Sequence, residues 1–151
     1  MTFRELMGEL SSRLGMEVED EGGASAVEID GLVIFMVGAN DDLILLHADL
    51  GEIPPDVRED VIDAAMEANF LYQGTGGCTL AVNPHDGHLQ LQKYNWLERL
   101  DGDKMIDTLE RFANTAAIWR KMAQDLVAKQ AETESGLGAD GLGMDGGGIR
   151  V

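Results

Sequence analysis

The chain has 151 residues, 44% of them hydrophobic, and its 28 acidic and 11 basic side chains give a formal net charge of −17. This length and hydrophobic content fit a single folded domain and exclude an intrinsically disordered chain. Because an acidic surface repels phosphate backbones and anionic headgroups, we expect no nucleic-acid and no membrane partner, and no apolar run reaches the roughly 20 residues of a membrane span.

The first predicted element is an amphipathic helix over residues 3–14. Thr2 and Glu5 have the spacing of a capping box, in which each side chain satisfies a free backbone N–H at the start of a helix. Apolar residues then recur at helical spacing as far as Gly15, which can end the helix in the left-handed conformation. An acidic connection over residues 17–23 follows.

Three antiparallel strands are predicted next, over residues 25–30, 32–37 and 43–50. The first two flank Asp30-Gly31, a two-residue turn signal, because glycine readily takes the positive φ that such a turn needs. This tight turn sets the pairing of the first two strands.

The loop between the second and third strands is longer and does not fix their pairing by itself. We place Val37 opposite Leu43, which puts Phe35 opposite Leu45. A slip of one residue would move every side chain of the third strand to the other face of the sheet.

The second and third strands are unusual because long stretches of both are apolar at every position. A strand with one solvated face should alternate apolar and polar side chains, since successive side chains point to opposite faces. One face collects Val27, Ile29, Leu32, Ile34, Met36, Ile44 and Leu46. The other face collects Val33, Phe35, Val37, Leu43 and Leu45, with Glu28 and His47 beside them. The predicted helices cover one face only, so we expect a second copy or a bound peptide on the other.

The sheet is completed after a second helix, which opens at Pro54-Pro55 and fades near residues 69–72. Strands are predicted over residues 78–82 and 88–96. They flank a further turn signal, Asp86-Gly87, so we expect them to form a second hairpin.

The longest predicted helix covers residues 103–130, where apolar residues at alternating spacings of four and three form a packing seam. From Glu132 the chain is rich in glycine, and we predict a folded domain over residues 1–131 with a disordered tail over residues 132–151. The predicted fold is α+β, a five-stranded antiparallel sheet with three helices in the order α-β-β-β-α-β-β-α.

Little in the sequence indicates catalysis. The glycine-rich stretch over residues 74–77 lacks the Gly-Lys-Ser/Thr ending of a phosphate loop, and Cys78, the only cysteine, is expected to be a buried thiol in a reducing cytoplasm. His85 and His88 flank a tight turn with Asp86, at a spacing that permits a surface metal site or a small metal enzyme. No third strong ligand lies nearby in sequence, so we expect no metal, no cofactor and no enzymatic activity.

Several short motifs stand in a characteristic order between residues 3 and 127. They are a Leu-x-x-x-Leu and glycine at residues 10–15, Asp49-Leu50-Gly51-Glu52-Ile53-Pro54, Ala68-Asn69-Phe70-Leu71, Thr75-Gly76-Gly77-Cys78-Thr79-Leu80-Ala81-Val82, and a final helix with Phe112 and Trp119. In this order and spacing they resemble the class I chaperones of bacterial type III secretion, the Tir chaperone-like family. The glycine-rich tail is not typical of that family.

The resemblance implies a non-enzymatic homodimer in the cytoplasm of a Gram-negative bacterium. Such a chaperone binds the N-terminal region of a secreted effector protein in an extended, non-globular form and keeps it soluble and export-competent. This agrees with the apolar second face of the sheet, on which an extended segment could lie, or the segment could add a strand to the sheet edge. The family's dimer interface would correspond to Val61, Ala65, Ala68, Thr79 and Tyr94. The alternative is a regulatory or sensory protein of the same fold that sequesters a signalling or transcriptional partner.

Overall fold

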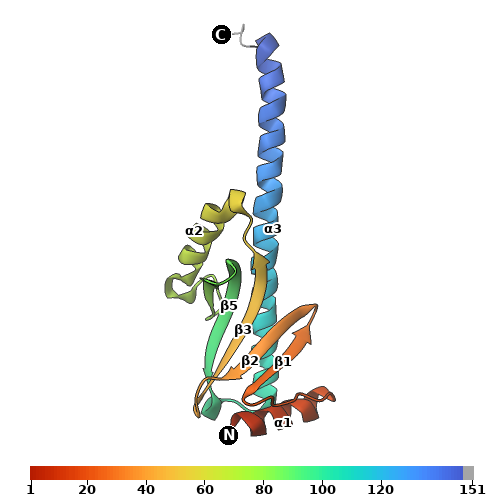
Figure 1. The fold of residues 1–151 in the computed structure, drawn as a ribbon, viewed down its shortest axis with the longest axis vertical. Helices are drawn as coiled ribbons and strands as arrows, with labels where there is room; N and C mark the ends of the chain where they lie inside the picture. Colours follow the sequence, from red (N-terminus) through yellow and green to blue (C-terminus); the bar gives the residue numbers. More distant parts are fainter. Residues whose placement is uncertain (148–151) are drawn as a thin grey trace.

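The helices and strands follow one another in the predicted order. The computed structural model describes the backbone of residues 1–147 and the side chains of residues 1–136. The elements are α1 (Phe3–Leu14), β1 (Ala24–Ile29), β2 (Leu32–Gly38), β3 (Leu43–Glu52), α2 (Arg58–Asn69), β4 (Thr79–Val82), β5 (His88–Trp96) and α3 (Gly102–Gly147), with short 3₁₀ turns at Pro55–Val57, Phe70–Tyr72 and Leu97–Arg99 (Figure 1). This confirms the α+β class and the order α-β-β-β-α-β-β-α.

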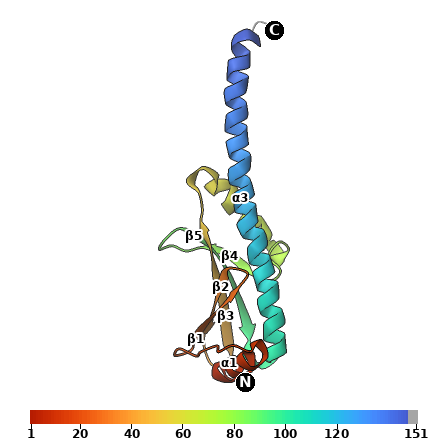
Figure 2. The same cartoon turned by 90° about the vertical axis from the view of Figure 1, so that its right-hand side faces the viewer.

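The strands form one antiparallel sheet in the order β1-β2-β3-β5-β4. The helix α3 runs along one side of this sheet, and α1 lies across one end of the molecule (Figures 1 and 2). An ion pair holds α1 to the start of α3, with Nε of Arg13 donating to Oδ1 of Asp103 at 2.6 Å. Over residues 1–147, the helices therefore lie on one face of the sheet and none covers the other (Figure 2).

The core lies between the sheet and α3, where the predicted inner face is confirmed. On the strands its buried side chains include Val27, Leu32, Ile34, Met36, Ile44 and Leu46. The helices contribute Leu6, Met7 and Leu10 from α1 and the seam of Met105, Leu109, Phe112, Ala116 and Trp119 from α3. The spacings of three and four in α3 thus mark the side that packs on the sheet.

The pairing of β2 with β3 differs from the predicted register by two residues. Val37 lies opposite Leu45, and Phe35 lies opposite His47 rather than Leu45. The loop is no longer than predicted but lies one residue later in the sequence, over residues 39–43. The Asn40 side chain stabilises it by accepting hydrogen bonds from two backbone N–H groups at 2.9 and 3.0 Å. A shift of two residues keeps every side chain on its predicted face, since the period of a strand is two.

The helix α3 continues through Gly147, where the sequence predicts a disordered tail from residue 132. Alanine, lysine, glutamine and glutamate over residues 128–134 favour a helix, which accounts for its extension past residue 130. This part of α3 projects beyond the sheet (Figures 1 and 2), and residues 148–151 of the predicted tail lie outside the described residues. The division at residue 131 stays a prediction. In the part of the chain that the structure describes, no helix is long and apolar enough to cross a bilayer.

Candidate functional site

An apolar surface lies on the side of the sheet that faces away from α3. We call it the outer face; it comprises Val33, Phe35, Val37, Leu43, Leu45, Tyr94 and Trp96. Val33 and Phe35 are 41% and 42% exposed, and Tyr94 and Trp96 are 58% and 48% exposed. Such large side chains are normally buried, so a contiguous group of them makes the outer face a candidate binding surface.

The pairing of β3 with β5 extends the outer face beyond the five residues predicted on β2 and β3. Tyr94 lies opposite Leu45, and Trp96 lies opposite Leu43. The sequence prediction missed Trp96 and assigned Tyr94 to a dimer interface. Their spacing of two along β5 puts both on one face, but which face becomes clear only once β5 is paired with β3.

The His47 side chain belongs to the outer face and behaves as an apolar ring. It stacks on Phe35, with ring centroids 5.0 Å apart and planes inclined by 17°. Burial among these neighbours lowers the pKa of His47, because a charged imidazolium is poorly solvated there. The ring is thus neutral at neutral pH and adds to the apolar surface.

A second apolar feature lies beside the edge of the sheet. A groove of about 200 Å³ runs between the end of α1, the strand β1 and α3. Its lining includes Leu14, Met16, Val27, Ile29, Ile106 and Leu109, with Glu28 and Glu110 as its charged members. Because β1 pairs only with β2, its other edge presents backbone groups that an added strand can pair with.

The residues expected at a dimer interface differ in accessibility. Val61 and Ala65 are buried inside the single chain, on the inner side of α2, and offer little surface to a partner. Ala68 and Thr79 are half-buried, and Tyr94 is exposed on the outer face. The helical spacing of Val61 and Ala65 therefore marks the side of α2 that packs on the core of the same chain.

The end of α2 exposes a cluster of apolar side chains that the sequence prediction did not single out. Met66, Phe70, Leu71 and Tyr72 are each more than half exposed. The backbone of Leu71 and Tyr72 is left-handed, with φ of 52° and 57°, which is unusual for bulky residues. Backbone strain of this kind is found where a side chain is held in place for contact with a partner.

The Asn69 side chain joins the end of α2 to the free edge of β4. Its Nδ2 donates to the Leu80 carbonyl and its Oδ1 accepts from the Leu80 N–H, both at 2.9 Å. It therefore imitates the pairing of a neighbouring strand. This contact explains the structural role of the Ala68-Asn69-Phe70-Leu71 motif.

The glycine-rich loop over residues 74–77 is a structural turn, as the sequence predicts. The buried Thr75 hydroxyl donates to the Cys78 carbonyl at 2.6 Å, and Nε1 of Trp119 donates to the Gly74 carbonyl at 3.1 Å. Cys78 is buried, and burial raises the pKa of its thiol, so it stays protonated at neutral pH.

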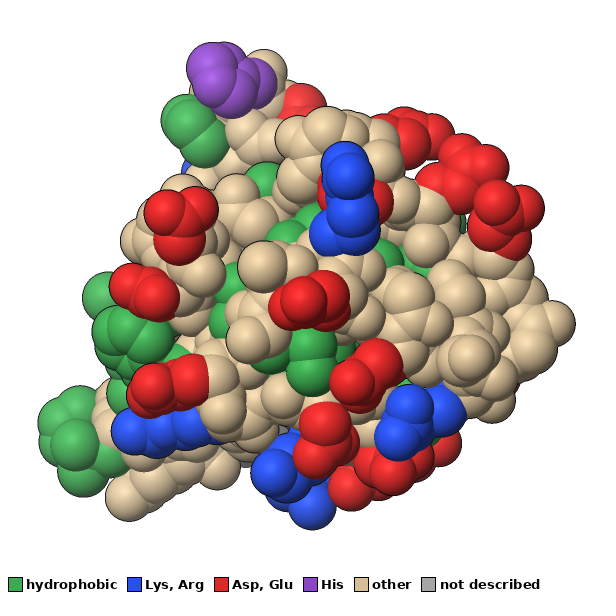
Figure 3. Space-filling model, turned by 90° about the horizontal axis from the view of Figure 1, so that it is seen from below, with side chains coloured by type: hydrophobic (Ala, Val, Ile, Leu, Met, Phe, Trp, Pro, Cys, Tyr) green, Lys and Arg blue, Asp and Glu red, His purple; other side chains and the backbone are tan. Residues whose placement is uncertain are grey.

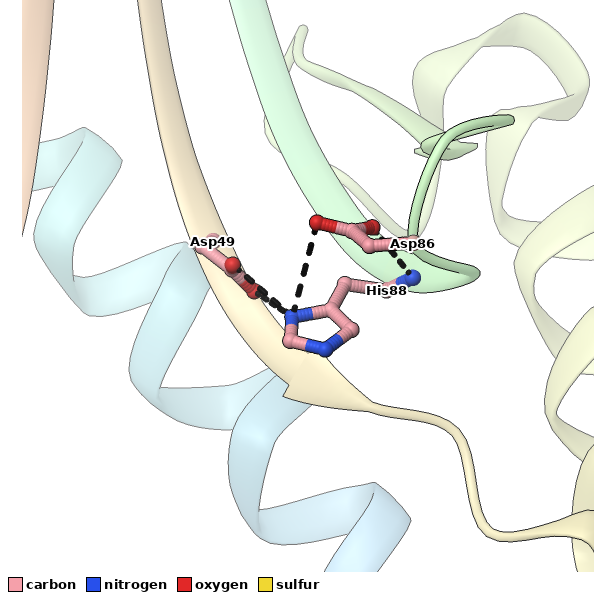
Figure 4. Close-up of side chains that lie close together, drawn as sticks. All are labelled: Asp49, Asp86 and His88. Atoms are coloured by element: carbon pink, nitrogen blue, oxygen red, sulfur yellow. Dashed lines mark hydrogen bonds and ion pairs between the residues drawn. The ribbon is translucent and has the colours of Figure 1, made fainter.

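The third feature is polar and lies where β3 meets the β4–β5 hairpin. Asp49, Asp86 and His88 bring two carboxylates and an imidazole together, with their ligand atoms within 4.8 Å of one another (Figure 4). Nδ1 of His88 lies 2.9 Å from Oδ2 of Asp49 and 4.0 Å from Oδ2 of Asp86. The sequence prediction had found His88 and Asp86 but no third ligand. His85 lies in the exposed turn, outside this group.

Charged side chains are scattered over the end of the molecule where α1 lies (Figure 3), and four acidic side chains also line a cleft between α2 and α3. Seen from the end where α1 lies, acidic side chains are scattered among fewer basic ones, and hydrophobic side chains gather along one side (Figure 3). This agrees with the net charge of −17. The acidic surroundings favour a partner of opposite charge.

Comparison with known proteins identifies the family. The model of the Tir chaperone protein (CesT) family matches residues 5–120. No curated protein matches the chain in sequence. The fold is similar to a chain of the HopA1–SchA chaperone–effector complex, with a TM-score of 0.65 and 15% identity over 79% of this chain and 93% of that chain.

Two further solved structures have a similar fold. One contains the Yersinia pestis type III secretion chaperone SycH with a stable fragment of YscM2 (TM-score 0.60, 20% identity, 78% of this chain and 99% of that chain). The other is the ExoT–SpcS complex from Pseudomonas aeruginosa (TM-score 0.60, 19% identity, 76% of this chain and 94% of that chain). Since the family model covers most of the sheet and helices described above, the chain belongs to the Tir chaperone protein (CesT) family of class I type III secretion chaperones, which bind other proteins and are not enzymes.

Proposed function

We propose that this chain acts as a homodimer that binds the N-terminal region of a secreted effector protein and keeps it soluble and export-competent. The client segment is held in an extended, non-globular form, in the cytoplasm of a Gram-negative bacterium. The observation that carries this proposal is the outer face, where four of seven apolar side chains are exposed and the other three are only partly buried, on an otherwise highly acidic chain. Family membership and the chaperone–effector complexes of similar fold support the same function.

The geometry of the outer face favours an extended client over a folded one. Its residues lie in short rows across neighbouring strands, such as Val37, Leu45 and Tyr94 in one row and Leu43 with Trp96 in the next. An extended segment presents a side chain to one side at every second residue, which matches rows of this kind. Because these side chains are already partly buried, covering each one contributes less than the about 1.5–3 kcal/mol of full burial, so contacts along several rows must together outweigh the cost of association.

The groove beside β1 offers a continuation for the same segment. A strand added to the free edge of β1 would pair its backbone and direct alternate side chains toward the apolar lining, including Leu14 and Met16. Glu28 and Glu110 favour basic residues in the client at this point. The proposed client is therefore a segment of alternating apolar residues with scattered positive charge.

The cluster at the end of α2 supports self-association. Met66, Phe70, Leu71 and Tyr72 lie apart from the two client surfaces in the sequence and are held outward by left-handed backbone at the last two positions. A second copy would cover this cluster, and Val61 and Ala65 would support it from inside the chain. Burial of such apolar clusters is typical of stable homodimers.

The proposal is tested by placing charges on the outer face. Val33 and Phe35 are both replaced by aspartate, and Asn114→Asp with Gln124→Asp on exposed sides of α3 is a control that adds the same two negative charges. We expect the outer-face variant to stay a folded dimer but to retain at least about 100-fold less client, since it loses two apolar contacts and adds two charges. The control should retain the client.

The readout is co-purification from the native host, with mass spectrometry of the bound proteins and the mass of the complex. Two copies of the chain with one effector, retained through its N-terminal region, support the proposal. Unchanged client binding by the outer-face variant would overturn the binding surface. A folded regulator in place of an effector would replace the proposal with the regulatory alternative.

A further inference from the structure

We propose that Asp49, Asp86 and His88 form a binding site for one divalent transition-metal ion, with Zn²⁺ as the reference ion. This site does not depend on the proposed function, because it lies at the junction of β3 with the β4–β5 hairpin and shares no residue with the outer face. The site cannot be recognised from the sequence alone, because Asp49 and His88 are 39 positions apart.

The three side chains converge from two separate segments. Asp49 stands at an irregularity of β3, where the pairing with β5 shifts between Asp49 and Gly51. Asp86 lies in the turn before β5, and His88 is the first residue of that strand. In Figure 4 the imidazole of His88 points its Nδ1 toward both carboxylates. All three ligand atoms lie within 4.8 Å of one another, a spacing that one ion can bridge with small side-chain rotations.

Backbone hydrogen bonds orient both carboxylates before any ion binds. Oδ1 of Asp49 accepts from the Gly51 N–H at 2.7 Å, and Oδ1 of Asp86 accepts from the His88 N–H at 2.9 Å. Such outer contacts fix the direction of ligand atoms and raise metal affinity. Each carboxylate keeps its second oxygen for the ion.

The local charge favours a cation. Among the residues whose side chains are described, the ion pairs of Asp49 and Asp86 run to His88 and to no lysine or arginine. Glu52 lies opposite His88 in the strand pairing and adds further negative charge. A single imidazole thus compensates only part of the negative charge of the nearby carboxylates.

The donor set selects the class of ion. One imidazole nitrogen with two carboxylate oxygens suits Zn²⁺ and related transition metals, whereas Ca²⁺ and Mg²⁺ prefer sites made of oxygen alone. The three side chains are each partly exposed, so water can fill the remaining coordination positions. The ion takes the place of the proton shared by Nδ1 of His88 and the Asp49 carboxylate, and that proton leaves to solvent.

A bound ion would fasten the hairpin to β3. The β4–β5 turn carries Asp86, and β3 carries Asp49, so one ion joins elements that are otherwise connected by backbone pairing and the His88 contact. Because the ion binds the folded chain, it raises the unfolding temperature, and the gain grows with the logarithm of its concentration relative to its dissociation constant.

The test uses the full chain without an affinity tag, freed of metal by a chelator and dialysed. Zn²⁺ is titrated at neutral pH by calorimetry, with Ca²⁺ and Mg²⁺ as comparison ions. The variants are Asp49→Asn, Asp86→Asn and His88→Gln; asparagine keeps the oxygen that accepts the backbone bond. Asp41→Asn and His85→Gln are matched controls in exposed loops.

We expect one Zn²⁺ per chain and a rise in unfolding temperature for the wild type and both controls, and affinity at least about tenfold weaker for each site variant. NMR signals of the His88 ring should shift on addition of Zn²⁺. The absence of stoichiometric Zn²⁺ binding by the wild type, or equal binding by the wild type and all three site variants, would overturn the proposal. Client retention is measured separately and is expected to be the same for these variants, so failure of the metal site leaves the chaperone proposal intact.

Discussion

Replacing Asn69 by alanine should clearly lower the stability of the fold, although the Asn69 side chain is only partly buried. Its side chain makes two hydrogen bonds of 2.9 Å to the backbone of Leu80, a residue only 4% exposed. Each bond contributes about 1 kcal/mol, and a buried backbone group left without a partner costs about 1–3 kcal/mol. We therefore expect Asn69→Ala to lower the free energy of unfolding by about 2–4 kcal/mol.

A second substitution tests whether the loss of stability comes from the hydrogen bonds and not from the size of the side chain. Asn69→Asp keeps an oxygen that accepts from the Leu80 N–H but places an anion against the Leu80 carbonyl, which has no proton to offer. Its cost should thus be comparable to that of Asn69→Ala, although the side chain keeps its size. Asn114→Ala, an exposed helical position on α3, is the control and should change stability by less than about 0.5 kcal/mol.

The measurement is urea denaturation followed by circular dichroism at one fixed protein concentration, because the proposed self-association would make apparent stability depend on concentration. A midpoint for Asn69→Ala equal to that of the Asn114→Ala control would refute the reasoning. It would show that water replaces the Asn69 amide at the edge of β4 at no cost.

Three further predictions concern other parts of the chain. Burial lowers the pKa of His47 in the folded state, so below the ordinary pKa of histidine the unfolded chain binds a proton that the folded chain does not. The free energy of unfolding should therefore decrease as the pH falls below that ordinary pKa. Replacing His47 by glutamine should flatten this dependence between about pH 5 and 8 in denaturation curves. Leu71→Gly should raise the stability of the single chain by up to about 1 kcal/mol, since left-handed backbone suits glycine, while weakening dimerisation in sedimentation measurements. Removing residues 132–151 should leave the unfolding temperature and client binding unchanged, and a loss of either would contradict the predicted domain boundary.

The two faces of the sheet could be predicted from sequence because alternation along a strand is a local property. Val33 and Phe35 fall on one side and Ile34 and Met36 on the other whatever their partners are. The pairing itself was wrong by two residues, since the turn lies one residue later in the sequence, where Asn40 accepts hydrogen bonds that hydrophobic patterns do not signal. An even shift leaves the faces unchanged, which is why the apolar outer face was predicted correctly despite it.

What the sequence could not supply depends on contacts between distant segments. Trp96 joins the outer face through its pairing with Leu43 across β3 and β5, and Asp49 joins His88 through the same pair of strands. Both require knowing that the β4–β5 hairpin lies beside β3 and not beside β1. The exposed end of α2 was missed for another reason: the left-handed backbone of Leu71 carries no sequence signal in a residue other than glycine.

The arrangement of helices explains why an apolar outer face and an acidic chain occur together. Both α1 and α3 bury their apolar sides on the inner face, so the outer face stays open in the single chain. An open apolar sheet face promotes aggregation, and a net charge of −17 opposes it through repulsion between copies. The same charge does not oppose a basic or neutral client. On the proposed function, acidity thus opposes aggregation through the outer face without opposing the binding of a client there, a distinction that the apolar surface alone does not make.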